Sequence, residues 1–189
     1  FPLSELTKTK VRGIARKLQL SAANKPDSQE LCFVPKDYRK FLKSEMNNPP
    51  LPGEFTNIYG EVLGEHKGLP FYTIGQRSGL GLSDATPYYV VKIDKEQNSI
   101  VLGKEDDLYS KTVYVSNVNW VSITAPGIPL IASVKLRFAH HGVVANLIPE
   151  PESKVRLELE NPERAVTPGQ AAVFYQDDIV LGGGRIDYS

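Results

Sequence analysis

Apolar positions near the start of the chain repeat with the period of a helix. Four of them stand three or four places apart with Lys and Arg between them: Val11, Ile14, Ala15 and Leu18. Thr7 stands where a helix cap is expected, so the pattern predicts an amphipathic helix over residues 8–18. A second, shorter helix is predicted over residues 36–45, because Pro35 lies near its start and apolar residues recur along one side.

From residue 53 onward the apolar positions follow the period of strands instead. Short apolar or alternating runs, separated by turn residues, predict strands over residues 71–74, 88–93, 99–102, 112–120, 131–138, 143–148, 155–159, 171–175 and 178–181. Residues 94–98 separate two of these runs and are predicted to form a hairpin loop. No segment after residue 46 has room for a long helix. The prolines within residues 47–53 indicate a linker, because they remove donors and fix backbone angles.

Together these patterns predict a mainly β fold with a short helical N-terminal segment. We expect that segment at residues 1–46, a small central β domain at residues 47–110, and a C-terminal β-barrel resembling translation-factor barrels at residues 111–189. The boundary between the two β parts is expected in the polar stretch at residues 104–107, whose acidic side chains are expected in a solvated loop.

Charge changes this picture at the N-terminal end only. The chain has no net charge, but residues 1–44 hold ten Lys and Arg against four Asp and Glu, a local excess of +6. Such a basic segment fits an anionic partner, and it fits a solvated helix face equally well.

Composition excludes several classes of protein. No apolar run approaches the ~20 residues that a membrane-spanning helix needs, so no membrane partner is expected. The N-terminus lacks the basic and apolar regions of a signal peptide, and a single cysteine excludes an internal disulfide framework; both favour the reducing cytoplasm. The first residue is Phe rather than Met, from which we expect a fragment of a longer protein.

Cys32 is the candidate covalent nucleophile. Basic residues surround it and a predicted helix begins just after it, and both features favour the reactive thiolate. The alternative is that Cys32, beside Leu31 and Phe33, is a small buried hydrophobic residue in a strand. Spacing alone favours that alternative.

Two further stretches have compositions suited to nucleic-acid contact. Residues 75–81 are punctuated by glycine and carry Gln76 and Arg77, which suits close approach to a phosphate; a β-turn with an ordinary surface Arg is the alternative. Arg137 and Phe138, at the end of a predicted strand, combine a cation with an aromatic ring. This pair is suited to holding an RNA backbone and an exposed base.

Three other features are interpreted as structural. His66 lies in a glycine-flanked turn and is expected to make a local hydrogen bond rather than to act as a base or ligand. His140 and His141 have no Cys or His cluster to complete a metal site, so no metal is predicted. Residues 182–184, three glycines, lack the Lys and Ser or Thr of a phosphate loop and are expected to form a bulge or tight bend in the barrel.

Several motifs resemble those of one enzyme family in their order and spacing. They are DSQELCF at residues 27–33, YGEVLGEHKGL at 59–69, YTIGQRSGLG at 72–81, AVTPGQAAVFY at 165–175 and LGGGRI at 181–186. Along essentially its whole length the chain is similar to the tRNA-specific 2-thiouridylases. The resemblance implies an enzyme whose PP-loop domain uses ATP with Mg to activate C2 of the wobble uridine, which then receives sulfur from a persulfide.

The same resemblance implies roles for particular residues. Cys32 would carry the persulfide, and residues 1–46 would be the end of the catalytic domain. The positions matching tRNA contacts are Gln76, Arg77, Arg137, Phe138 and Gln170. Family members often have Tyr where this chain has Phe138, which keeps the stacking surface and loses the hydroxyl. From residue type alone, Gln170 fits a turn amide that satisfies local backbone groups equally well.

The family's PP-loop and its second cysteine, which attacks the persulfide or closes a disulfide after transfer, do not occur in this sequence. We therefore expect the chain by itself to bind no ATP and to be inactive, with tRNA and a sulfur-relay donor protein as its partners. The alternative is a non-catalytic β-barrel module that binds RNA or protein.

Overall fold

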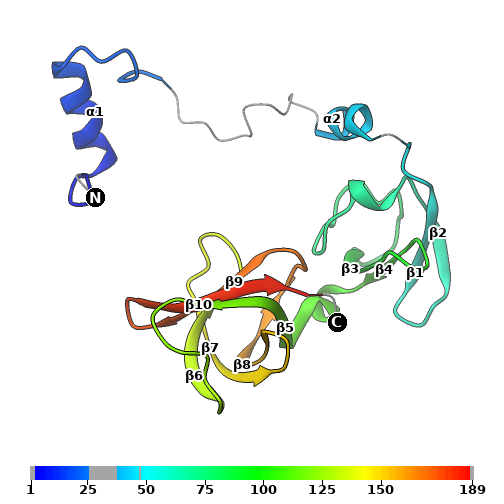
Figure 1. Cartoon of the computed structure of the whole chain (residues 1–189). Helices are drawn as coiled ribbons and strands as arrows, with labels where there is room; N and C mark the ends of the chain where they lie inside the picture. The colour runs from blue at the N-terminus through cyan, green and yellow to red at the C-terminus, as the bar shows by residue number, and fades with distance from the viewer. Residues whose placement is uncertain (1–2, 26–37, 47, 188–189) are drawn as a thin grey trace. The chain divides into compact units, whose positions relative to one another are not determined.

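The computed structural model describes residues 3–25, 38–46 and 48–187, and the chain divides into two compact units, Phe1–Asn47 and Asn48–Ser189. The first unit holds α1 (Lys8–Lys17) and α2 (Tyr38–Glu45) (Figure 1). The Oγ1 atom of Thr7 accepts a hydrogen bond from the Lys10 N–H at 3.4 Å, which caps α1 as predicted. The first predicted helix is confirmed and ends one residue early; the first two residues predicted for the second helix lie outside the described ranges.

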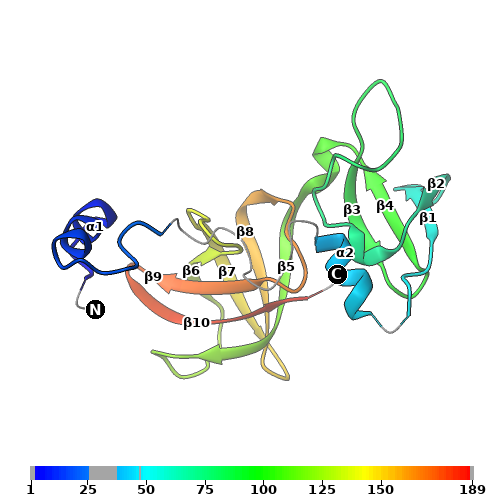
Figure 2. The same ribbon diagram turned by 90° about the horizontal axis from the view of Figure 1, so that it is seen from above.

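The second unit begins with a four-stranded sheet in the order β2-β1-β4-β3 (Figure 2). Its strands are β1 (Gly53–Asn57), β2 (Val62–His66), β3 (Tyr89–Asp94) and β4 (Ser99–Gly103). β1 and β4 run parallel, while the other neighbours are antiparallel. Buried side chains of this sheet form a small core of their own with Leu80 from the loop before β3: Phe55, Val90, Ile100 and Leu102.

The strand predicted over residues 71–74 is wrong. Leu69–Phe71 form the short 3-10 helix η1, with Pro70 in its first turn and Gly68 before it at φ +119°. Phe71 is buried, so the apolar run does supply core, but without pairing as a strand. β1 and β2, which lie before this run, were not predicted.

Six antiparallel strands then close a barrel in the order β10-β5-β8-β7-β6-β9. They are β5 (Tyr109–Trp120), β6 (Leu130–Lys135), β7 (Val143–Glu150), β8 (Lys154–Arg164), β9 (Ala171–Gln176) and β10 (Ile179–Ile186). Alternate residues point inward, as the period of a half-buried strand requires. The barrel core is built from apolar side chains, and among those that are fully buried are Val134, Leu147, Leu157 and Phe174. The mainly β fold with a helical N-terminal segment, a small sheet and a C-terminal barrel is therefore confirmed.

Residues 182–184 lie within β10 and form the predicted bulge. The register shifts between Val180 and Gly182 against β9, and between Gly183 and Arg185 against β5. A Cβ atom at Gly182 would lie 2.5 Å from the Asn119 carbonyl oxygen, so only glycine allows the two backbones to approach this closely.

The loop between β3 and β4 at residues 94–98 is the predicted hairpin loop, and the Asp94 Oδ1 atom accepts from two of its backbone N–H groups. Acidic residues 105–107 belong to the 3-10 helix η2 (Glu105–Leu108) instead of a loop, and Asp107 accepts from the Lys104 N–H at 2.7 Å. In the described residues after 48, η1 and η2 are the only helical turns.

No helix of the described part is long and apolar enough to cross a membrane. The predicted domain boundaries stay predictions.

Candidate functional site

The loop that carries Gln76 and Arg77 is tightly braced. The Gln76 Oε1 atom accepts from the Thr73 N–H at 3.1 Å, and its Nε2 atom donates to the Ser78 carbonyl at 2.9 Å. Backbone hydrogen bonds to Val90 fix the same loop to β3. The Gln76 amide is thus used to hold the loop in shape, and it leaves the Arg77 side chain exposed beside it.

Arg77 lines a hollow of about 330 Å³ together with residues 79–84, Pro87 and Tyr88. Lys104 contacts one of the lining residues, because its Nζ atom lies 2.6 Å from the Asp84 Oδ2 atom, and it also donates to the Thr86 carbonyl at 3.0 Å. The hydrogen bond from Lys104 holds the pKa of Asp84 below its ordinary value. The Asp84 carboxylate is therefore paired with Lys104 within the protein.

The loop at residue 75 packs directly on the barrel. Gly75 has φ +83°, and a Cβ atom placed there would lie 2.9 Å from the Cβ atom of Ala165. Glycine is required here by its backbone angle and by this close approach. Ala165 directly follows β8, and we call residues 163–167, the last two residues of β8 and the turn after it, the β8 corner.

Arg164 links the β8 corner to the sheet. Its Nε atom lies 2.7 Å from the Glu105 Oε1 atom and its Nη2 atom 3.5 Å from Oε2, so two hydrogen bonds join the guanidinium to one carboxylate. The guanidinium also lies 5.6 Å from the centre of the Tyr89 ring. The hydrogen bond from Arg164, then that from Tyr89, lowers the pKa of Glu105, and the charge of Arg77 adds to this effect.

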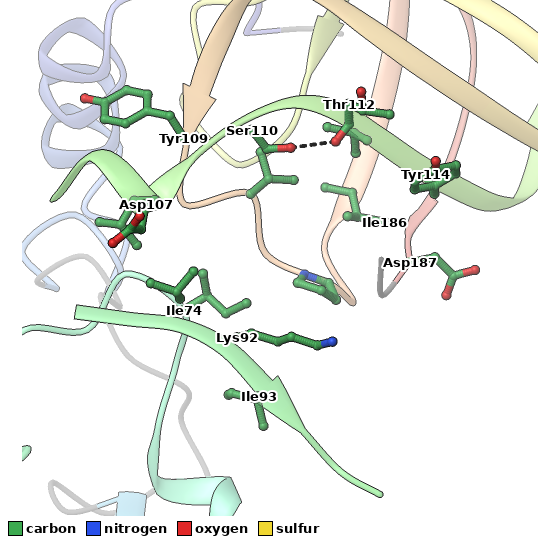
Figure 3. Close-up of a pocket in the computed structure, with 15 residues that line it drawn as sticks. Ile74, Lys92, Ile93, Asp107, Tyr109, Ser110, Thr112, Tyr114, Ile186 and Asp187 are labelled. Carbon is green, nitrogen blue, oxygen red and sulfur yellow. Dashed lines mark hydrogen bonds between the residues drawn. The ribbon is translucent and has the colours of Figure 1, made fainter. Parts of the chain in front are cut away.

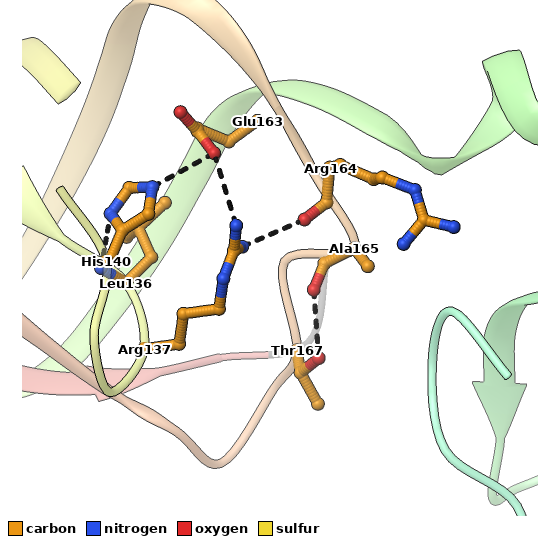
Figure 4. A network of polar contacts seen from close by, with 7 residues as sticks. All are labelled: Leu136, Arg137, His140, Glu163, Arg164, Ala165 and Thr167. Atoms are coloured by element: carbon orange, nitrogen blue, oxygen red, sulfur yellow. Dashed lines mark hydrogen bonds and ion pairs between the residues drawn. The ribbon is translucent and has the colours of Figure 1, made fainter. Parts of the chain in front are cut away.

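The turn that carries Arg137 and Phe138 is held by the same corner. The strand predicted over residues 131–138 ends early, because β6 ends at Lys135, and Arg137 and Phe138 therefore lie in the turn that follows it. The Arg137 Nη1 atom donates to the Arg164 carbonyl at 3.1 Å, and its Nη2 atom lies 3.9 Å from the Glu163 Oε2 atom (Figure 4). The Phe138 side chain is 100% exposed.

His140 closes this turn from the other side. Its Nδ1 atom accepts from the Leu136 N–H at 3.3 Å, so the ring proton must sit on Nε2, which donates to the Glu163 Oε2 atom at 3.1 Å (Figure 4). Within the described residues no group of three or more His, Cys, Asp or Glu could hold a metal ion. His66 is buried and is the last residue of β2, so it lies in a strand and not in the predicted turn. Its Nδ1 atom accepts from the Gly68 N–H at 3.0 Å, which is the expected local hydrogen bond, and its Nε2 atom lies 3.0 Å from the Asn98 carbonyl oxygen of the neighbouring loop.

Gln170 lies in the turn that follows the β8 corner. Its backbone N–H donates to the Thr167 carbonyl and its own carbonyl accepts from the Ile186 N–H, while its side chain is exposed. The Thr167 hydroxyl in turn donates to the Ala165 carbonyl at 3.0 Å. The loops that carry Gln76, Arg137 and Gln170 therefore all meet the β8 corner.

A cavity of about 260 Å³ opens next to this corner (Figure 3). Its lining comes from β3, from β5 and from the turn after β8, and includes Ile74, Lys92, Thr112, Tyr114, Val166 and Asp187. These residues are far apart in the sequence, and sequence reasoning named none of them.

Sequence reasoning also missed the residues that organise the corner, which are Glu105, His140, Glu163 and Arg164 as a network. The partners Arg164 and Glu105 stand 59 positions apart, so no local motif joins them. Cys32 lies outside the described residues, and its role stays a prediction.

Comparison with known families accounts for nearly the whole chain. Residues 1–36 match the family model described as tRNA methyl transferase HUP domain, residues 39–104 the tRNA methyl transferase PRC-barrel domain, and residues 110–186 the aminomethyltransferase beta-barrel domain. The curated tRNA-specific 2-thiouridylase MnmA of Symbiobacterium thermophilum is 44% identical over 188 residues, which are 99% of this chain and 48% of the relative. The chain belongs to the tRNA-specific 2-thiouridylase family.

Further curated members of the family agree with this assignment. The MnmA protein of Acetivibrio thermocellus is 44% identical over 98% of this chain and 52% of its own length, and that of a Synechococcus species is 43% identical over 99% and 50%. The chain thus spans about half the length of the curated relatives it matches. In this chain, Gln76 and Arg77 fall in the part matched by the PRC-barrel model, while Arg137, Phe138 and Gln170 fall in the part matched by the beta-barrel model.

Proposed function

We propose that the chain is the tRNA-docking and sulfur-carrying part of a cytoplasmic tRNA-uridine 2-sulfurtransferase. Family membership supports tRNA as the partner and thiolation as the reaction. The observation that carries the docking role is that three loops converge on the β8 corner. Two of these loops carry the fully exposed ring of Phe138 and the exposed cation of Arg77, so both side chains belong to the same unit.

Each docking residue has a chemistry that suits RNA. The exposed guanidinium of Arg77 would pair with a backbone phosphate, next to the hollow that it lines with residues 79–84. The exposed Phe138 ring would stack on an unpaired base. Gln170 would donate to or accept from a base or ribose, while Gln76 and Arg137, whose polar groups contact other parts of the protein, would shape the surface between these residues.

The Cys32 thiol is proposed as the persulfide carrier that delivers sulfur to C2 of the wobble uridine, supplied in turn by a sulfur-relay donor protein. A persulfide sulfur is nucleophilic in its deprotonated form, and the basic residues of the N-terminal segment favour that form. The glycine run at residues 182–184 is packed inside β10, so it is not the phosphate-binding loop that ATP would need. We therefore assign nucleotide activation to the part of the relatives that this chain does not cover.

The carrier role is tested by Cys32→Ser in the intact enzyme. The variant should bind tRNA as tightly as the parent protein and produce no 2-thiouridine, measured by mass spectrometry of digested tRNA. Undiminished thiolation would refute the carrier role. Phe138→Ala serves as the matched control, because it should weaken tRNA binding and leave sulfur loading of Cys32 intact.

The docking role is tested by footprinting tRNA with the chain. Protection of the anticodon stem-loop, lost in Arg77→Ala and kept in Lys154→Ala, is the expected result. Lys154 is a suitable control because it is exposed and lies at the opposite end of β8 from the corner. Protection of the tRNA elbow alone, or no protection at all, would favour a non-catalytic binding module instead.

A further inference from the structure

We propose that Arg137, Glu163 and His140 position Phe138 for stacking on an unpaired nucleobase, and that Arg137 itself makes no phosphate contact. This inference rests on the proposed docking of tRNA at the β8 corner. An Arg beside an exposed aromatic ring is ordinarily expected to bind the RNA backbone. The inference instead gives Arg137 the role of holding the turn that carries Phe138.

The first observation is where the Arg137 guanidinium points. One nitrogen donates to the Arg164 carbonyl at 3.1 Å, and a second lies 3.9 Å from the Glu163 carboxylate. Both partners belong to the end of β8, so these contacts tie the turn to the barrel wall. Figure 4 shows the side chain extended toward the corner and not away from it.

The second observation is that the other end of the turn is anchored as well. The His140 N–H donates to the Arg137 carbonyl at 3.2 Å, and the His140 ring joins the Leu136 N–H to the Glu163 carboxylate. The ring is almost buried, which protects these hydrogen bonds from water. The Glu163 carboxylate therefore holds both residues that flank the short loop.

Phe138 is the part of this turn that is presented outward. It stands between Arg137 and His140, both anchored to Glu163, and its own ring is completely exposed. A fully exposed Phe has no packing role in the folded chain, so its place on an anchored turn is informative. An aromatic ring held in place loses less conformational freedom when a base stacks on it, which increases affinity without any new contact.

Glu163 allows a sharp test, because electrostatics and positioning predict opposite results. Removing an acidic group from an RNA-binding surface should tighten RNA binding if charge alone matters. If Glu163 positions Phe138, removing it should weaken binding, although the surface becomes more positive.

The experiment measures binding of a fluorescent anticodon stem-loop to the full chain over a range of salt concentrations. Glu163→Met, which removes both the charge and the acceptors, should weaken binding by about 5-fold or more, within the contribution of one stacked base. Glu163→Gln removes the same charge and keeps an acceptor for His140, so it should recover part of the loss. Tighter binding by Glu163→Met would overturn the inference.

A double-mutant cycle provides the second readout. Arg137→Ala should weaken binding in the parent chain, have little further effect in the Phe138→Ala background, and leave the slope of log K against log salt unchanged. Arg77→Ala is the matched control, and it should lower that slope by about 0.7–0.9, as loss of one phosphate contact requires. Additive effects of Arg137→Ala and Phe138→Ala, or a lower slope for Arg137→Ala, would overturn the inference.

The two proposals fail in different ways. If Arg77→Ala weakens binding and Phe138→Ala does not, docking at this surface survives and the positioning role is wrong. If neither substitution changes binding, the docking proposal itself fails, and the positioning role fails with it.

Discussion

Gly75→Ala tests the contact between the sheet and the barrel on which the whole surface depends. An alanine forced to the φ of +83° seen at residue 75 is destabilised by about 1–2 kcal/mol. Alanine also restricts the unfolded chain more than glycine does, which stabilises the folded state by about 0.4–1 kcal/mol and offsets part of this loss. The new methyl group would also lie 2.9 Å from the Ala165 Cβ atom, closer than the ~3.5–4.0 Å of a favourable carbon contact. Such overpacking adds about 1–3 kcal/mol to the loss of stability.

The overpacking part can be isolated by changing the neighbour. Ala165 has φ +54°, so Ala165→Gly removes the opposing methyl group and relieves a strained angle. Alone it should change the free energy of unfolding by less than about 1 kcal/mol, because relief of strain and greater unfolded-state freedom oppose each other. In the Ala165→Gly background, Gly75→Ala should then be less destabilising by about 1 kcal/mol or more.

Urea unfolding followed by Trp120 fluorescence measures this coupling, since Trp120 lies 5.6 Å from the Phe174 ring in the barrel core. Gly60→Ala is the matched control, because Gly60 has φ +86° and nothing within 4 Å of its Cβ position. It should show the backbone effect alone and no coupling to residue 165. Additivity of Gly75→Ala and Ala165→Gly within about 0.3–0.5 kcal/mol would show that the two residues are not neighbours in solution.

Three further predictions concern the core, the helix cap and the ion pair at the corner. Phe174→Ala should destabilise the barrel by about 3–5 kcal/mol in the same urea assay, because the ring is fully buried; an unchanged midpoint would contradict the barrel core. Thr7→Ala should destabilise α1 by about 0.5–2 kcal/mol and speed its amide exchange, while the barrel midpoint stays fixed because α1 has no buried residues. The pKa of Glu105 lies below the ordinary 4.5, so its pairing with Arg164 stabilises the fold above that pH and is lost as the pH falls through the lower folded value. Glu105→Gln should remove this part of the acid dependence of the unfolding midpoint, and an identical pH profile would contradict it.

The barrel strands could be predicted because their alternation is strong and their turns are marked by polar residues and glycine. The sheet was harder. Phe71 and its neighbours have the composition of a strand, but Pro70 and the left-handed Gly68 direct the chain into a helical turn. β1 is short and half-exposed at most positions, so its apolar signal is carried by Phe55 alone.

The exposed residues of the candidate site could likewise be predicted from local sequence, while the contacts between distant residues could not. Arg77, Phe138 and Gln170 were predicted from local composition and from motifs that resemble a family; all three are exposed, and their role as tRNA contacts stays a prediction. The contacts of Arg137 could not be predicted, because its partners are a carboxylate and a carbonyl at the end of β8, 26 and 27 positions further along the chain. Contacts between residues so distant in sequence are fixed by the barrel's closure, which no single segment encodes.

The order of strands around the barrel also bears on how the protein is made. β5 is the first barrel strand to be synthesised, and one of its two neighbours is β10, the last. A growing chain therefore carries an unpaired edge on β5 until the ribosome has delivered the glycine run of β10. A premature stop or slow translation within β10 should leave an incomplete barrel with an unpaired edge on β5. Such changes should be seen first as aggregation in the cell.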